Sequence, residues 1–199
     1  MNKEKPIILA SASITRRRMM GAAGVSFIFK KPRVDEGALK KVAIKRRYGL
    51  RQTAEFLAKS KAESISRQFR DKYVVGADQV LGFRNKIIHK PQSVVTARKA
   101  LRTLNGKKHQ LITSTCIFKD CKMSWKYTST NTLYMHKITK EEINKYLKEV
   151  GKKDILSVGI YQIEGPGIRL FTKIEGDFFS ILGLSLVQLL NFLRKRRVI

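Results

Sequence analysis

The sequence predicts an α/β protein built around a mixed β-sheet. Short apolar runs of strand-like composition alternate along the 199 residues with segments that repeat apolar side chains at helical spacing. Hydrophobic residues make up 43% of the chain, which is enough apolar surface to offset the entropy cost of folding. No internal repeat or low-complexity linker interrupts this alternation. We therefore expect a single domain over residues 1–199.

The first half of the chain begins with a strand and a helix. Ile7–Ala10 is a short buried strand, and Ser13 is a suitable N-cap for a helix over 15–23 that ends at Gly24. The next expected elements are a strand over 25–29, helices over 38–47 and 53–69, and a strand over 73–77. Because Asp78 follows that apolar run directly, we expect the strand to stop there.

Hairpin signals dominate the second half of the chain. The expected hairpins join 80–83 to 86–89 and 109–118 to 122–136, the second pair antiparallel around Asp120. Thr139 and Glu142 form a capping box that opens a helix to about residue 150. The remaining expected elements are helices over 94–104 and 184–193, a tight turn over 165–167 and a strand over 168–174.

The net charge is strongly positive. Lys and Arg number 42 against 15 Asp and Glu, which gives +27 at pH 7. Such a balance favours an anionic partner, namely a nucleotide, nucleic acid or a membrane surface, although a general lysine bias explains the scattered distribution equally well. The sequence shows no helix-turn-helix spacing, zinc pattern or aromatic RNA-binding signature, so we expect no specific nucleic-acid partner.

The cysteine content and the lengths of the apolar stretches indicate in which cellular compartment the protein is expected. Cys116 and Cys121 lack a second Cys/His pair and form no disulfide framework, which is typical of a reducing environment. The apolar run near the start is too short for a signal peptide, and the longest apolar stretch, 178–190, is too short for a membrane span. We expect a cytoplasmic protein with no membrane partner.

Phosphate-binding chemistry is expected where the first strand meets the first helix. Ser11, Ser13 and Arg16 lie there, and a helix N-terminus offers free backbone N–H groups and the positive end of the helix dipole. Arginine adds forked donors that suit phosphate oxygens. An ordinary N-cap beside a solvated basic turn would show the same residues, so both interpretations stay open.

Carboxylates and a lysine follow the later strands. Asp78 comes after a buried strand, where open α/β sheets bind ligands, and could hold a divalent cation or deprotonate a water. Lys90, before Pro91, could reach a phosphate, and Glu36 in a basic loop could contact a metal. The alternatives are a turn-capping aspartate and a surface lysine. The chain has no Walker A loop, no GxGxxG motif and no metal-binding histidine spacing.

Taken in order, these segments resemble the Maf family of nucleoside triphosphate pyrophosphatases. The matching pieces are 9–13 with Arg16, Asp35-Glu36, Lys61-Ala62, Gly76-Ala77-Asp78, Lys90-Pro91, 161–165, 174–177 and 183–186. The likeness covers about residues 7–193 and rests on the whole set in this order. It implies an elongated α/β fold of the Maf and ITPase kind, with a central mixed β-sheet flanked by helices and two lobes around a cleft.

The resemblance also implies an activity. The family hydrolyses a nucleoside triphosphate to the monophosphate and pyrophosphate, and it needs a divalent cation, Mg²⁺, Mn²⁺ or Co²⁺. It is associated with the removal of non-standard nucleotides and with arrest of cell division. A homodimer is a further expectation from the family.

Residue roles follow from the matching motifs. Asp78 is expected to accept the proton of the attacking water, and Lys61 and Lys90 are expected to be catalytic with it. The residues expected to bind substrate are Ser11, Ser13, Arg16, Glu36, Gln79 and Glu164, and those expected to hold the metal are Asp78 and Glu36. Asp177 is a weaker candidate for the same chemistry.

Departures from the family pattern leave the base preference open. The family motifs have an arginine where this chain has Thr15, a threonine at Gln79, a glutamine at Glu164 and a proline at Ser185. The substrate could therefore carry uracil or thymine, or it could be 7-methyl-guanosine triphosphate or another modified nucleotide. A second hypothesis is a Maf-like nucleotide-binding protein with little catalysis, which acts on cell division through partners.

Overall fold

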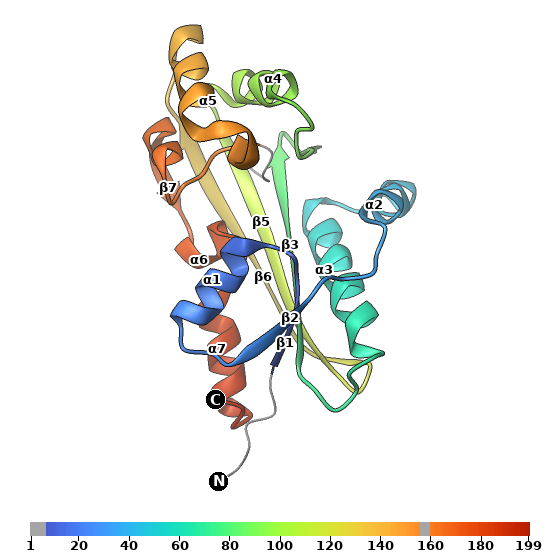
Figure 1. The fold of residues 1–199 in the computed structure, drawn as a ribbon. Helices are drawn as coiled ribbons and strands as arrows, with labels where there is room; N and C mark the ends of the chain where they lie inside the picture. Colours follow the sequence, from blue (N-terminus) through green and yellow to red (C-terminus); the bar gives the residue numbers. More distant parts are fainter. Residues whose placement is uncertain (1–6, 156–159) are drawn as a thin grey trace. The chain divides into compact units, whose positions relative to one another are not determined.

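The chain divides into two compact units. The computed structural model describes residues 7–155 and 160–199, and the side chains of 152–155 are left undescribed. The first unit contains the chain up to Gln79 together with Thr113–Ser129 and Asp177–Ile199, and the second contains Val80–Ile112 and Thr130–Gly176 (Figure 1). The single domain expected over 1–199 stays a prediction.

The strands form a mixed sheet, as predicted. In the order β2-β1-β3-β5-β6-β7, strand β1 (Ile7–Ala10) lies between β2 (Phe27–Lys30) and β3 (Val74–Phe83) and is parallel to both. Strand β4 (Lys86–Ile88) pairs antiparallel with β3, and β7 (Phe171–Glu175) pairs antiparallel with β6 (Lys122–Met135). Strand β5 is Lys108–Lys119.

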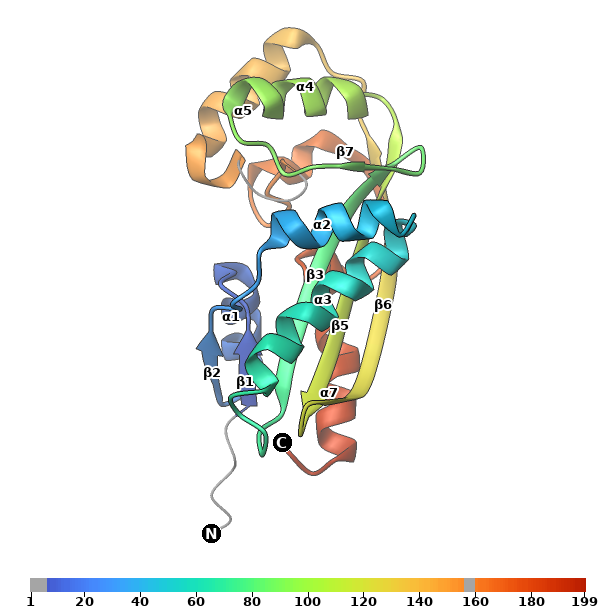
Figure 2. The same ribbon diagram turned by 90° about the vertical axis from the view of Figure 1, so that its right-hand side faces the viewer.

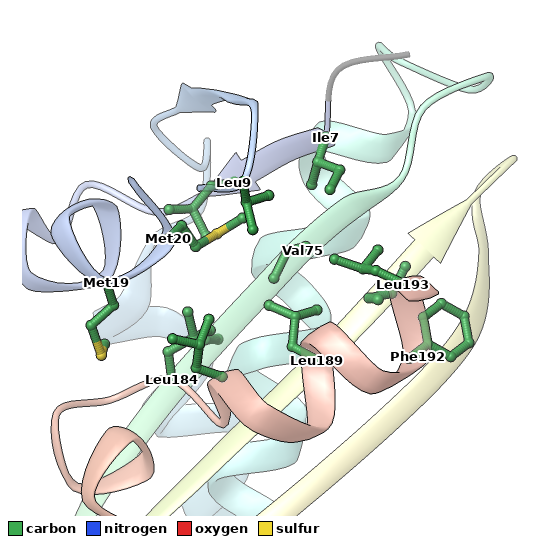
Figure 3. Packing of buried hydrophobic residues seen from close by; sticks show 13 residues of the cluster. Ile7, Leu9, Met19, Met20, Val75, Leu184, Leu189, Phe192 and Leu193 are labelled. Carbon is green, nitrogen blue, oxygen red and sulfur yellow. The ribbon is translucent and has the colours of Figure 1, made fainter. Parts of the chain in front are cut away.

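Alternating side chains give the first unit a core on each face of its strands. Leu9 and Val75 point to one face and pack against helices α1 (Ile14–Ala22) and α7 (Leu186–Lys195), as Figure 3 shows. Ile8 and Val74 point to the other face and pack against α3 (Leu50–Ser66), which crosses the strands in Figure 2. Because successive side chains of a strand alternate between its two faces, every second side chain of β3 faces α3.

Gly76 allows the close approach of α3 to β3. A Cβ atom at this position would lie 2.5 Å from the carbonyl oxygen of Ala58 and 2.7 Å from Cβ of Ala62. We expect Gly76→Ala to lower the free energy of unfolding by about 1–3 kcal/mol, because α3 must move away from the strand. Urea unfolding measures this loss. Gly21→Ala in α1 is the control, since its Cβ meets nothing within 4 Å and alanine is the better helix former. An equal loss in both variants would contradict the explanation.

The second unit carries two helices beside its strands. Helix α4 (Val94–Leu104) ends at Asn105, as predicted, and α5 (Lys140–Ile155) opens with the expected bonds between Thr139 and Glu142. A backbone break at Gly151, with φ 75° and ψ 162°, interrupts α5.

Both predicted hairpins have two-residue turns. Arg84 and Asn85 have φ of 49° and 60°, and Asp120 and Cys121 have φ of 52° and 60°. Positive φ at both central residues defines the type I′ turn, whose twist matches that of antiparallel strands. The β3–β4 and β5–β6 connections are therefore confirmed.

Four predictions of elements need correction. Strand β3 does not stop at Asp78 but continues to Phe83, because Lys61 compensates the buried carboxylate. Residues 168–170 belong to a 3₁₀ helix, Pro166–Leu170, that also replaces the expected turn. The strand expected over 25–29 covers Phe27–Lys30. Helix α6 (Phe178–Ile181), a short helix that Asp177 caps, was missed, and α7 begins only after it.

The remaining bounds differ by a few residues. Helix α2 is Glu36–Lys45, and α3 begins at Leu50.

Within the described ranges, no helix combines the length and the apolar character that a membrane span requires.

A buried histidine in the second unit predicts acid sensitivity. His109 is 2% exposed, its Nε2 lies 2.7 Å from the Tyr161 hydroxyl, and burial lowers its pKa to about 4. At a pH between the ordinary histidine pKa of about 6.5 and the lowered pKa of about 4, His109 is protonated in the unfolded chain but neutral in the folded chain. The free energy of unfolding should therefore fall by about 3 kcal/mol as pH drops through this window.

Urea unfolding between pH 7.5 and 4.5 tests this prediction. His109→Phe should flatten the pH dependence, whereas His89→Gln, at an exposed position, should leave it as in the wild type. The same slope in His109→Phe and in the wild type would assign the acid sensitivity to other groups.

Candidate functional site

A buried ammonium group lies between two carboxylates in the first unit. Lys61 Nζ is 2.6 Å from Asp78 Oδ1 and 2.8 Å from Glu36 Oε1. The Lys61 and Asp78 residues are each only 7% exposed, while the Glu36 side chain is about half exposed at 52%. Residues 36, 61 and 78, which are far apart in the sequence, thus meet at one point, and their roles stay predictions.

The end of β1 explains why Asp78 is reachable. The last residue pair between β1 and β3 joins Ala10 to Gly76, so β3 runs past its parallel neighbour at Ala77 and Asp78. Strand alternation turns Asp78 to the α3 face, where Lys61 projects. Carboxylates at the end of a parallel strand are well placed for a ligand even though β3 itself continues.

Helix α2 brings the second carboxylate. Asp35 caps this helix by accepting a hydrogen bond from the Ala38 backbone N–H at 3.0 Å. Glu36 is the first residue of the helix. Asp35 therefore has a structural task, and Glu36 is the acidic residue of the pair that reaches Lys61.

Arg16 is held in place by backbone carbonyls. Its Nε donates to Gly183 O at 2.7 Å, and its Nη1 donates to Ala77 O at 2.8 Å and to Ser11 Oγ at 3.3 Å. Ser13 caps α1 by accepting from the Arg16 backbone N–H. Within the described part of the chain, Nη2 of Arg16 makes no hydrogen bond. This guanidinium nitrogen is therefore available to donate to a ligand.

The pKa values of Asp78 and Glu36 shift in opposite directions. Burial raises the pKa of Asp78 above its usual value, against the opposing positive charges of Lys61 and Arg16. Burial also disfavours ionised Glu36, but the hydrogen bond and charge of Lys61 outweigh it, with Lys40 and Arg16, and lower the pKa of Glu36. Burial therefore makes Asp78 more basic than a free aspartate, whereas Lys61 makes Glu36 more acidic than a free glutamate.

Gln79 faces the opposite side of β3 from Asp78. Its Nε2 donates to Thr113 Oγ1 at 3.0 Å and to the carbonyl oxygens of Ser180 at 3.1 Å and Ile181 at 2.9 Å. These bonds tie α6 to the strand. The amide nitrogen of Gln79 thereby supports the chain segment that carries Gly183, and the predicted contact of Gln79 with substrate stays a prediction.

The other predicted residues lie elsewhere. Lys90 and Glu164 are exposed residues of the second unit, and their contact with substrate stays a prediction. Asp177 caps α6 by accepting from the Ser180 backbone N–H at 2.8 Å, which accounts for its presence there.

Gly183 was missed as a contributor to the site. Its carbonyl orients Arg16, and its φ of 103° is reached far more easily by glycine than by other residues. The Gly-Leu pair of the matching motif was a signal for its backbone, but only the fold brings residue 183 to residue 16.

The carboxylates fit a divalent cation in chemistry. Among the described residues no group of three or more His, Cys, Asp or Glu gathers at one point. Glu36 and Asp78 each present one oxygen to Lys61, while the second oxygen of each makes no hydrogen bond to a described residue. Magnesium is commonly held by one or two carboxylates completed by phosphates and water, and this pair suits that arrangement.

Comparison with known proteins supports the resemblance. The family model described as Maf-like protein matches residues 6–196. A nucleoside triphosphate pyrophosphatase of Pelagibacter ubique is 38% identical over 190 residues, which cover 96% of this chain and 97% of that protein. A 7-methyl-GTP pyrophosphatase of Rhizobium meliloti is 37% identical over 192 residues, covering 96% of each.

A solved structure, that of the Staphylococcus aureus Ham1 protein, is similar to the chain with a TM-score of 0.45 and 14% identity, covering 67% of this chain and 73% of that one. The family match spans nearly the whole sequence and includes every motif from Ser11 to Ser185. This chain is therefore a member of the Maf-like family.

Proposed function

We propose that this chain hydrolyses a nucleoside triphosphate to the nucleoside monophosphate and pyrophosphate, with 7-methyl-GTP as the preferred substrate. The relatives at 37–39% identity carry the names nucleoside triphosphate pyrophosphatase and 7-methyl-GTP pyrophosphatase. The observation that carries the proposal is the Glu36–Lys61–Asp78 group beside Arg16, in which Lys61 and Asp78 are buried. The enzyme class is that of a hydrolase acting on a phosphoanhydride bond.

Asp78 is the proposed general base. A water oxygen forms a bond to the α-phosphorus while its proton moves to the Asp78 carboxylate. The bond from the α-phosphorus to the α–β bridging oxygen breaks, and its electron pair leaves with pyrophosphate. A pKa raised by burial suits this task, because a more basic carboxylate accepts the proton more readily.

Positive charge stabilises the departing group. Lys61 keeps Asp78 oriented at 2.6 Å, and Arg16 offers Nη2 to a phosphate oxygen. Ser11 and Ser13 lie at the N-terminus of α1, whose dipole also favours phosphate. Glu36 and Asp78 would hold the divalent cation. Such a cation, when bound, neutralises phosphate charge and lowers the pKa of a bound water.

The family resemblance also implies that Lys90 contacts the phosphates and that Glu164 contacts the substrate. Both contacts remain predictions. A purine methylated at N7 carries positive charge, which a carboxylate attracts. The contact of Gln79 with substrate also remains a prediction. The further expectations from the family, a role in arrest of cell division, a homodimer and a cytoplasmic location, remain predictions.

Pyrophosphate release from a panel of triphosphates tests the function. The panel contains the standard nucleotides, 5-methyl-uridine and pseudouridine triphosphates and 7-methyl-GTP, each with Mg²⁺, Mn²⁺ or Co²⁺ and after chelation. We expect release that disappears with the chelator, returns with the metal and is fastest with 7-methyl-GTP.

Two results would change the proposal. Faster release from uridine or thymidine triphosphate would keep the reaction and replace the base. Tight nucleotide binding without release under any condition would favour the nucleotide-binding protein instead of the enzyme.

A further inference from the structure

A hollow of about 720 Å³ opens in the first unit, and neither Asp78 nor Lys61 lines it. One wall is the loop after β2, from Lys30 to Asp35, and the other is the end of α3 and the turn that follows it. Its volume falls in the range of small-molecule sites, about 300–1,000 Å³. Neither wall contains a residue that the proposed reaction uses.

The hollow combines an apolar floor with a cationic wall. Phe69 is half-buried against the core and presents apolar surface to the space, whereas Ile65 is 2% exposed and offers almost none. Lys30, Lys31 and Arg33 line the opposite wall. This pairing of ring and cations is the chemistry that binds a nucleobase together with phosphate.

The cations of the wall are not neutralised. In the described part of the chain none of the three forms an ion pair, and Lys30 Nζ lies 5.7 Å from the Phe69 ring centroid. The acidic side chain of the lining, Asp35, is occupied as the cap of α2. An anion can therefore bind without displacing a carboxylate.

The hollow borders the catalytic group through two elements. Ile65 follows Lys61 by one turn of α3, about 6 Å along the helix axis. Asp35 precedes Glu36 directly. A ligand in the hollow would thus contact the elements that hold Lys61 and Glu36 without occupying their place.

We propose that this hollow binds a second nucleotide, outside the catalytic group. Its phosphate lies against Lys31 and Arg33, and its base packs on Phe69. The chemical class is a nucleoside 5′-monophosphate, which the proposed reaction releases. The proposal rests on the hollow itself and does not require the reaction to take place.

Lysine acetylation followed by peptide mass spectrometry tests this site at the level of residues. The acetylation rates of Lys30 and Lys31 are measured with guanosine or 7-methyl-guanosine monophosphate, and with orthophosphate at equal ionic strength. At a nucleotide concentration three times the Kd we expect about fourfold slower acetylation, since the free fraction is 1/(1 + [L]/Kd). Orthophosphate should protect much less, and Lys195 in α7 should not respond.

Variants that keep both reporter lysines provide the decisive comparison. Arg33→Gln removes a cation and Phe69→Leu removes the ring but keeps apolar bulk. Each should abolish most of the protection, while Arg196→Gln, an equal charge change on α7, should leave it intact. Asp78→Asn should also leave it intact, so that loss of turnover and loss of this site remain separate results.

Three outcomes would overturn the proposal. The first is no protection by any nucleotide. The second is equal protection by orthophosphate and nucleotide, which would show an anion site without base recognition. The third is protection by single-stranded RNA at concentrations far below those of the mononucleotide, which would make the hollow part of a nucleic-acid surface.

Discussion

Asp78→Asn is expected to reduce kcat for pyrophosphate release by about 10²- to 10⁴-fold, the usual contribution of a positioned general base. Asparagine has the same shape but cannot accept the proton. Nucleotide binding measured without a divalent cation should persist or tighten, because one negative charge near the phosphates is removed. Release assays with the preferred triphosphate and calorimetric binding to a non-hydrolysable analogue measure the two effects separately.

Asp120→Asn is the matched control for this change. It makes the same substitution in the β5–β6 turn of the first unit, where φ is 52° and asparagine is readily accommodated. It should keep nearly the wild-type rate. If Asp78→Asn kept more than a tenth of the wild-type kcat, another group would have to be the base.

Lys61→Met is expected to lower the free energy of unfolding by about 3 kcal/mol at neutral pH, because it leaves a buried carboxylate without its partner. The pKa of Asp78, already raised by burial, should rise further without the ammonium. A group whose pKa is raised by folding stabilises the fold below its unfolded pKa, near 4, and loses this contribution as pH rises through its folded pKa. The deficit relative to wild type should therefore grow from pH 4 to pH 7.

The same variant should alter catalysis in a recognisable way. The acid limb of the pH–rate profile should move to higher pH, because Asp78 must lose its proton to act as base. Lys59→Met, an exposed position two residues away on α3, is the control and should change neither quantity. A pH-independent stability deficit in Lys61→Met would mean that the Lys61–Asp78 pair does not control the ionisation of Asp78.

Local signals in the sequence predicted much of the fold. The β3–β4 and β5–β6 hairpins, the bounds of α4 and the capping box of α5 depend on contacts between residues close in the chain, so short windows contain the information. Strand β3 shows the limit of such windows. A carboxylate after an apolar run is typical of a strand end, but Lys61, seventeen positions earlier, makes its burial tolerable.

For the candidate site, too, the sequence predicted the local features but not the contacts between distant segments. The types of residue at 16, 36, 61 and 78 and their order in motifs predicted phosphate chemistry, because charge and hydroxyl groups are properties of the residues themselves. The sequence could not show that Gln79 would turn away from Asp78 toward α6, or that Gly183 would orient Arg16.

The sequence by itself determined the family, the mixed α/β class and the set of charged residues, since these depend on composition, local pattern and motif order. Only the tertiary structure decided the direction in which the pKa of each carboxyl shifts. Asp78 is buried on β3 just beyond the end of β1, whereas Glu36 stays half exposed beside the same ammonium group. The acidity of a carboxyl depends on how much water folding removes around it, and that is a property of packing between distant segments.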